Sequence, residues 1–216
     1  MLHAAVISPQ PMTRIAMQRE SQDHPEHGVR IGAAAGTVAE LLEQGPLEAP
    51  VVLLSMDTLD GRSTAQNIAD LTAHDHAVVV LASHTDVARV RSALAFGAAG
   101  AVGKWEPIRS VFRTMRLACQ LGDFVSDQLQ SALASLPDRS PAKLSARERE
   151  VLTHYVEGLQ EQEVAATLGI AESTVEEHLK RIRRKYALVE RPARTKLELY
   201  KRAIEDGVVP PVLPLA

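Results

Sequence analysis

The 216-residue sequence is short of several features that particular protein classes require. Its single cysteine, Cys119, excludes an intrachain disulfide framework and a multi-cysteine zinc site. Aromatic residues make up only 3%, too few for the base-stacking surfaces of single-strand-binding proteins. No apolar run approaches the roughly 18 residues of a membrane span, and the N-terminus does not read as an export signal. We therefore expect a cytoplasmic protein that does not contact a membrane.

The composition is otherwise that of a globular protein with little net charge. Hydrophobic residues make up 45% and charged residues 24%, which excludes global disorder. The formal net charge is −3, so the whole chain is not a polycation. Basic residues are nevertheless concentrated between positions 180 and 185, where the sequence reads KRIRRK.

The first part of the chain alternates short apolar runs with amphipathic segments. Strands are predicted at 3–8, 29–33, 51–55, 77–82 and 99–103, with helices near 11–21, 36–44, 62–73, 86–96 and 107–121. Alternation of this kind predicts a parallel sheet with helices on both faces. The predicted fold class is α/β, a flavodoxin-like doubly wound (βα)5 domain.

The second part lacks strand patterns and is predicted to be all-α. Helices are expected at 146–157, 161–168, 172–187 and 194–206. Gly169 ends the second of these, and Glu172, Ser173 and Thr174 are expected to cap the third. Two helices joined by a three-residue turn match a helix-turn-helix.

Helix 172–187 is predicted to have an apolar back and a charged front. At 100° per residue, one stripe carries Val175, Leu179, Ile182 and Tyr186 and should pack inward. The remaining surface could be an ordinary solvated face, but after a three-residue turn it is suited to a DNA major groove. The expected DNA-contacting residues are Ser173, Thr174, Glu176, Glu177, Lys180, Arg181, Arg183, Arg184 and Lys185.

The segment LSAREREVLTHYVEGLQEQEVAATLGIAESTVEEHLKRIRRKYAL (144–188) resembles the LuxR/FixJ-type four-helix DNA-binding domain. The matching positions include Leu144, Arg147, Glu148, Glu150, Val151, Leu152, Gly158, Glu163, Ala165, Leu168, Thr174, Val175, His178, Ile182 and Lys185. The resemblance implies that Arg147 and Glu148 are scaffold residues rather than catalytic ones. Glu176 and Glu177 depart from the family pattern, in which these DNA-facing positions are often basic or neutral. Carboxylates repel phosphates but accept hydrogen bonds from cytosine N4.

Residues 1–126 resemble a response-regulator receiver domain, and ALAFGAAGAVGKWEP (93–107) is similar to the stretch that contains the receiver lysine, here Lys104. The polar stretch 131–145 then separates two domains. We assign 1–126 to the receiver-like domain, 127–143 to a linker, and 144–216 to the DNA-binding domain with a C-terminal tail.

The resemblance also implies which receiver chemistry this sequence lacks. The positions of the acidic pair that holds Mg²⁺ fall on Ser8 and Pro9, and the phospho-acceptor position falls on Ser55. The hydroxyl position falls on Ala82, with Ser83 adjacent. We therefore interpret the domain as a pseudo-receiver that is not phosphorylated, with no cofactor and no metal.

Several alternatives remain open at this point. Asp57 is an alternative phospho-acceptor, with Asp60 as a metal ligand. The degenerate pocket formed by Ser8, Pro9, Ser55, Asp57, Ala82, Ser83 and Lys104 is a candidate site for a small ligand or a protein partner, because open α/β sheets bind ligands at their carboxyl ends. The histidines are scattered; His74 and His76 are weak metal candidates, and solvated loop side chains are the preferred interpretation.

The sequence therefore predicts a homodimeric transcription factor that binds double-stranded DNA without aspartyl phosphorylation. One rival is a conventional phosphorylated response regulator, and another is a protein that sequesters a second regulator and does not bind DNA. An enzyme has no support, because no nucleophile is paired with a base and no metal-ligand spacing is present.

Overall fold

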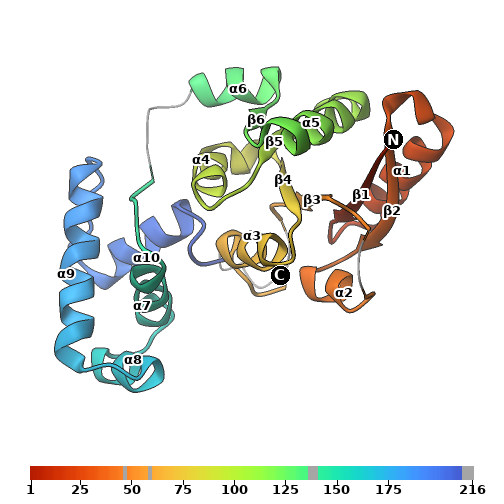
Figure 1. Ribbon diagram of the computed structural model, residues 1–216. Helices are drawn as coiled ribbons and strands as arrows, with labels where there is room; N and C mark the ends of the chain where they lie inside the picture. The colour runs from red at the N-terminus through yellow and green to blue at the C-terminus, as the bar shows by residue number, and fades with distance from the viewer. Residues whose placement is uncertain (46–47, 58–59, 136–140, 211–216) are drawn as a thin grey trace. The chain divides into compact units, whose positions relative to one another are not determined.

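The computed structural model describes residues 1–45, 48–57, 60–135 and 141–210. The chain divides into two compact units, Met1–Asp138 and Arg139–Ala216 (Figure 1). Within the described ranges, no helix combines the length and the apolar character that crossing a membrane requires.

The first unit is built on a six-stranded parallel sheet, which confirms the predicted fold class. The strands are β1 (Leu2–Ile7), β2 (Val29–Ala35), β3 (Val51–Ser55), β4 (Ala77–Ala82), β5 (Gly100–Gly103) and β6 (Phe124–Val125). Their order in the sheet is β2-β1-β3-β4-β5-β6, so the chain winds outward from β1 in both directions. This is the flavodoxin-like order extended by one short strand.

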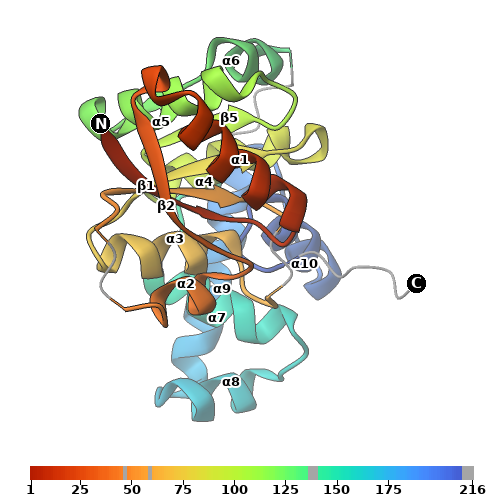
Figure 2. The ribbon, with the colours of Figure 1, turned by 90° about the vertical axis from the view of Figure 1, so that its right-hand side faces the viewer.

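Helices cover both faces of this sheet. The helices of the first unit are α1 (Pro11–Asp23), α2 (Val38–Leu42), α3 (Thr64–Ala73), α4 (Val87–Ala95), α5 (Ile108–Leu121) and α6 (Asp127–Ala134), with short 3₁₀ helices η1 (Pro25–His27) and η2 (His84–Asp86). One core joins the sheet to α2, α3, α4 and α6, and the other joins it to α1 and α5 (Figure 2). Successive residues of β1 alternate between the two cores, as the pleat of a strand requires.

The predicted linker begins too early. Residues 124–134 add β6 and α6 to the first unit, and Leu129 of α6 is fully buried in the sheet core. A two-residue strand and an eight-residue helix are too short for their periodicity to show in the sequence. Residues 136–140 of the predicted linker lie outside the described residues.

The second unit is all-helical, as predicted. It comprises α7 (Ala146–Val156), α8 (Glu161–Leu168), α9 (Glu172–Leu188) and α10 (Lys196–Glu205). The four side chains predicted as the apolar stripe of α9 are fully buried: Val175, Leu179, Ile182 and Tyr186. They pack α9 against α7 and α8, and this burial holds the opposite face of α9 outward.

Contacts near both ends of α10 hold this helix in the unit. Lys196, in its first turn, donates to the carbonyl oxygen of Leu159 at 2.8 Å and lies over the ring of Tyr155. At the other end, Arg191 forms ion pairs of 2.7 Å with Asp206 and 2.8 Å with Glu205. Arg191 and Asp206 are both buried, so the connection from α9 to α10 is fixed by charge pairing as well as by apolar packing.

Candidate nucleic-acid interface

Helices α8 and α9 form the predicted helix-turn-helix. Helix α8 begins with a reciprocal capping box between Gln160 and Glu163 and ends at Gly169, whose φ of 63° is left-handed. Residues 169–171 then make the turn. The predicted cap of α9 is wrong, because the N-cap residue is Ala171, which offers no side-chain acceptor, while Ser173 lies inside the first turn.

Buried polar contacts from α7 position the C-terminal half of α9. Glu148 closes a capping box with Ser145, and its carboxylate accepts from Lys185 Nζ at 2.6 Å. Burial raises the pKa of Glu148, but the hydrogen bonds from Lys185 and from the Ser145 backbone outweigh burial, so its net pKa is below the ordinary value. The carboxylate of Glu148 is therefore ionised and joins α7 to α9, the scaffold role expected of it.

Lys185 is consequently separated from the other predicted DNA contacts. Its side chain is 30% exposed and its ammonium group is bound to the buried Glu148. The sequence could not indicate this pairing, because the two residues are 37 positions apart. We therefore treat Lys185 as a structural residue.

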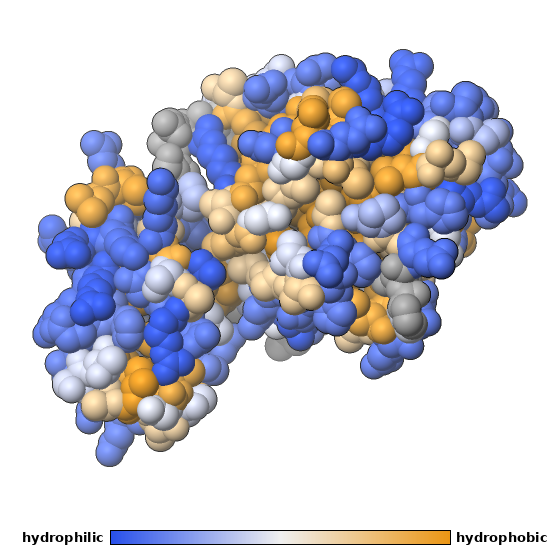
Figure 3. All heavy atoms as spheres, in the orientation of Figure 1, coloured by the Kyte–Doolittle hydropathy of each residue, from blue (hydrophilic) through white to orange (hydrophobic). Residues whose placement is uncertain are grey.

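The outward surface of α9 carries the remaining predicted residues. Thr174 and Arg183 are half-buried, and the exposed members are Ser173, Glu176, Glu177, Lys180, Arg181 and Arg184. Figure 3 shows hydrophilic side chains along most of this helix. The apolar back and polar front predicted from the helical periodicity are thus both present.

Charge is divided along this surface, acidic near the start of α9 and basic further on. Lys180 Nζ lies 3.6 Å from Glu177 and 4.0 Å from Glu176. All three side chains are at least half exposed, so these ion pairs are weak and can exchange for contacts to a ligand. Arg181 and Arg184 follow and present guanidinium groups to solvent.

A second polar cluster lies at the carboxyl ends of the sheet strands. Lys104, directly after β5, forms a 2.7 Å ion pair with Asp57, two residues after β3. Ser55 donates its hydroxyl hydrogen to the other carboxylate oxygen of Asp57. Burial raises the pKa of Asp57, but hydrogen bonds from Lys104 and Ser55 outweigh this effect and its net pKa is lowered.

Gln10 completes this strand-end cluster and was not predicted. Its amide donates to Asp57 Oδ2 at 2.8 Å and accepts from Lys104 Nζ at 3.3 Å. The one available signal was its position two residues after Ser8, at the end of β1. The strand-end cluster, defined as Gln10, Ser55, Asp57 and Lys104, therefore holds one carboxylate and one ammonium group that satisfy each other.

The other residues of the predicted pocket are at least partly buried or make hydrogen bonds outside the strand-end cluster. Ser8 is fully buried, and its hydroxyl accepts from the backbone N–H of Gln10 at 3.3 Å; Pro9 is half-buried. Ala82 is fully buried and accepts from the Lys104 backbone N–H at 2.8 Å. The Ser83 hydroxyl donates to Asp86 at 2.6 Å and so closes the start of η2.

The strand ends do not fit a magnesium ion. Mg²⁺ in receivers needs several oxygen ligands, usually carboxylates and waters. Across the described parts of the chain, no group of three acidic or histidine side chains gathers at these strand ends. Asp60 instead accepts from the Arg62 backbone N–H and from Asn67, at the start of α3.

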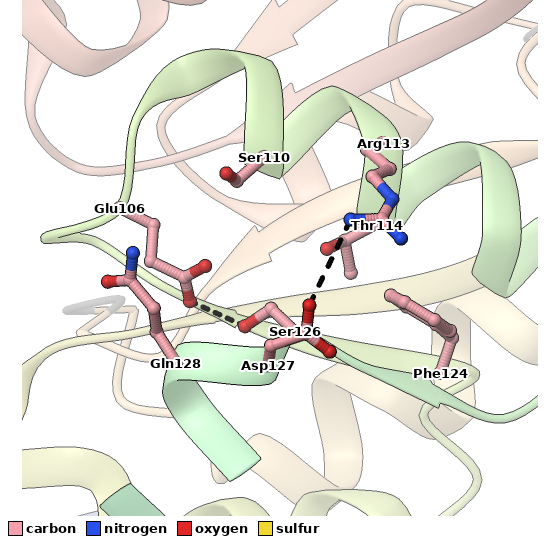
Figure 4. A pocket seen from close by; sticks show the side chains of 8 residues that line it. All are labelled: Glu106, Ser110, Arg113, Thr114, Phe124, Ser126, Asp127 and Gln128. Carbon is pink, nitrogen blue, oxygen red and sulfur yellow. Dashed lines mark hydrogen bonds and ion pairs between the residues drawn. The ribbon is translucent and has the colours of Figure 1, made fainter. Parts of the chain in front are cut away.

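A small pocket of about 90 Å³ lies elsewhere in the first unit, beside α5, β6 and the start of α6 (Figure 4). Its buried carboxylate, Glu106, accepts from the Ser126 hydroxyl at 2.5 Å and from the Gly103 backbone N–H at 2.9 Å. Arg113 lies 3.9 Å from Asp127 at the same cavity. None of the residues predicted to bind a ligand lines this pocket.

Comparison with known proteins identifies the family. Residues 142–193 match the family of bacterial regulatory proteins of the luxR type. The chain is 30% identical over 202 residues to the probable transcriptional regulatory protein NarL of Mycobacterium tuberculosis, covering 85% of this chain and 93% of that protein. The chain belongs to the family of NarL-type response regulators. A further relative of this family is the transcriptional regulatory protein MctR of Rhizobium johnstonii, 26% identical over 194 residues, with 88% of this chain and 86% of MctR covered.

Solved structures of response regulators share the fold. RcsB from Salmonella enterica bound to promoter rprA aligns with a TM-score of 0.56 and 17% identity, covering 94% of this chain and 98% of that one. ChrA, the response regulator of a heme-sensing two-component system, aligns with a TM-score of 0.51 and 22% identity, covering 96% and 98%. The protein is thus a DNA-binding transcriptional regulator of the NarL type, and its named relatives are regulators rather than enzymes.

Proposed function

We propose that the protein binds a specific double-stranded DNA site as a homodimer through the outward surface of α9. The observation that carries this proposal is the combination of four buried side chains on one stripe with exposed cations on the other face. A helix held in this way can enter a major groove, with its side chains divided between base edges and phosphates. RcsB, which shares the fold, is described in complexes with promoter DNA and as dimers on DNA.

The proposed contacts differ along α9. Ser173, Glu176 and Glu177 lie in its first two turns and are suited to base edges, where a carboxylate accepts from cytosine N4. Lys180, Arg181 and Arg184 follow and are suited to phosphates. Ala171 leaves the first turn without a side-chain cap, so backbone N–H groups there are also available to a phosphate. Two copies on an inverted repeat would place the half-sites about one helical turn apart.

We further propose that aspartyl phosphorylation does not control this binding. Asp57 is bound by Lys104, Ser55 and Gln10, and the acidic-pair positions hold Ser8 and Pro9. A phosphoryl group added to Asp57 would lack a metal to neutralise its charge during transfer. The domain division proposed with this function is a receiver-like domain that includes α6 and a DNA-binding domain from residue 144.

The test is selection of genomic DNA fragments by the full-length protein and, separately, by residues 140–216. Fluorescence anisotropy of the selected sites at several salt concentrations then gives affinities and salt dependence. We expect one inverted-repeat sequence from both proteins. A site bound by the fragment alone would mean that the first unit inhibits binding. No enriched sequence from either would contradict DNA binding and favour a protein that sequesters another regulator.

A further inference from the structure

The turn between α1 and β2 brings together side chains whose positions in the sequence form no recognisable metal-binding pattern. Helix α1 ends at Asp23, and the 3₁₀ helix η1 follows directly with the sequence PEH. Ligand atoms of His24, Glu26 and His27 all lie within 4.8 Å of one another. These three residues are called the η1 triad below. It is separate from both α9 and the strand-end cluster.

Backbone hydrogen bonds hold this turn in place. The backbone N–H of His24 donates to the carbonyl oxygen of Glu20 at 3.0 Å, and that of His27 donates to the carbonyl oxygen of His24 at 3.1 Å. Pro25 fixes the first position of η1, and Gly28 ends it in a left-handed conformation with a φ of 71°. The two imidazole rings are consequently held with their centroids 5.5 Å apart.

Packing supports one side of the η1 triad. The ring centroids of His27 and Phe112 lie 5.9 Å apart, and Phe112 is a fully buried residue of α5. Its Nε2 is 3.4 Å from a carboxylate oxygen of Glu20. His24 and Glu26 are exposed and joined by a 2.9 Å hydrogen bond. The side chain of His27 is thus positioned by its surroundings, while the other two can adjust.

The negative charge around the imidazoles favours a bound cation. A carboxylate oxygen of Glu26 lies 2.9 Å from His24 Nδ1, and one of Glu20 lies 3.4 Å from His27 Nε2. A metal ion bound between His24 and Glu26 would replace the hydrogen bond between them, and both groups would keep a partner. Two imidazole nitrogens and a carboxylate oxygen are the ligand types that zinc takes, whereas Mg²⁺ and Ca²⁺ prefer oxygen alone.

We propose that the η1 triad binds one divalent transition-metal ion, with His24, Glu26 and His27 as ligands and Glu20 beside them. Ligands of a tetrahedral zinc ion with bonds of about 2.1 Å lie about 3.4 Å apart. The ligand atoms now lie within 4.8 Å of one another, and rotations of the exposed His24 and Glu26 side chains would bring them to this spacing. Three protein ligands leave one coordination position for water.

The ion would join the end of α1 to η1, next to α5. His27 contacts α5 through Phe112, and Arg116 of the same helix lies against Gly28. Binding to the folded turn alone would raise the thermal stability of the first unit, because an ion that binds only the native state shifts unfolding. The proposed site does not depend on the proposed DNA function.

The experiment is isothermal titration calorimetry of ZnCl₂ into the full-length protein without an affinity tag, with MgCl₂ as the control ion. We expect one zinc ion per chain and no magnesium binding. The variants His24→Ala and Glu26→Gln should each weaken zinc binding by about tenfold or more, since even outer-shell changes cost that much. Both side chains are exposed, so circular dichroism of these variants should be unchanged.

His74→Ala provides the matched control. His74 is also exposed and follows the end of a helix, and its Nδ1 bonds only to the Asp70 carbonyl oxygen among the contacts described. This variant should bind zinc like the unchanged protein. X-ray absorption at the zinc edge should report nitrogen and oxygen ligands without sulfur. Two results would overturn the proposal: no zinc binding by the unchanged protein, or unchanged zinc affinity in both the His24→Ala and the Glu26→Gln variants.

Discussion

The two units differ in how the charged side chains at their candidate sites are arranged. In the second unit, the buried stripe of α9 and the Glu148–Lys185 pair hold a charged surface outward. In the first unit, the flavodoxin-like sheet has a buried core on each face, and the Asp57 carboxylate at its strand ends is already paired with Lys104. Packing and chemistry are thus separable: a fold can keep its core while the side chains at its strand ends differ.

The sharpest way to separate the two units is to damage one core at a time. Leu179→Ala in α9 removes a fully buried side chain and should lower the free energy of unfolding by about 2–5 kcal/mol. Leu53→Ala in β3 should cost a similar amount for the same reason. Urea denaturation measures both, and DNA binding at room temperature should be lost with Leu179→Ala alone. Equal loss of DNA binding in both would contradict independent units. Leu188→Ala, on an exposed side chain, is the control.

The contact between α7 and α9 should depend on pH. Glu148→Gln removes the charge from a buried group and should cost about 1–3 kcal/mol at pH 7. Because the folded pKa of Glu148 is lowered, its stabilising effect is present above the unfolded pKa and is lost as pH falls through the folded pKa. The difference between the two proteins in urea denaturation should therefore shrink below about pH 4.5, the ordinary glutamate pKa. A constant difference from pH 7 to pH 3 would be the contradictory result.

Arg184 and Lys185 are adjacent cations with different expected roles. Arg184→Ala should weaken DNA binding and reduce the slope of log affinity against log salt by about one unit per lost phosphate contact. Lys185→Ala should instead lower the stability of the second unit, because its partner, the Glu148 carboxylate, is left buried without a counter-charge. Salt-dependent anisotropy and urea denaturation distinguish the two effects. An unchanged slope for Arg184→Ala would show that Arg184 does not contact a phosphate.

The smallest effect is expected at the strand-end cluster. Asp57→Asn breaks a partly exposed ion pair with Lys104 and should cost about 1 kcal/mol or less. Affinity for the selected DNA site should not change. The chain's single tryptophan, Trp105, directly follows Lys104, so its fluorescence offers a local check that the variant is folded. A loss of DNA affinity would show that the cluster controls the second unit.

Features that depend on residues close together in the chain could be predicted from the sequence. The helical period of Val175, Leu179, Ile182 and Tyr186 was enough to identify the buried side of α9. The early strands could be located because their apolar runs are nearly continuous.

Features that depend on distant partners or short elements were missed. Lys185 belongs to the same basic run as Arg184, and only the fold brings it to Glu148. Gln10 reaches Asp57 across two strand ends, and β6 is too short to have a period. His24 and His27 form a cluster because a 3₁₀ helix turns between them, which the sequence pattern did not indicate.

The central claim, that DNA binding does not depend on an aspartyl phosphate, is tested by one comparison. Full-length protein and its Asp57→Asn variant are each incubated with acetyl phosphate and Mg²⁺, measured by intact mass spectrometry, and titrated against the selected DNA site by anisotropy. We expect no added phosphoryl mass and one dissociation constant under all conditions. A phosphoryl adduct that tightens DNA binding, and that disappears with Asp57→Asn, would contradict the account.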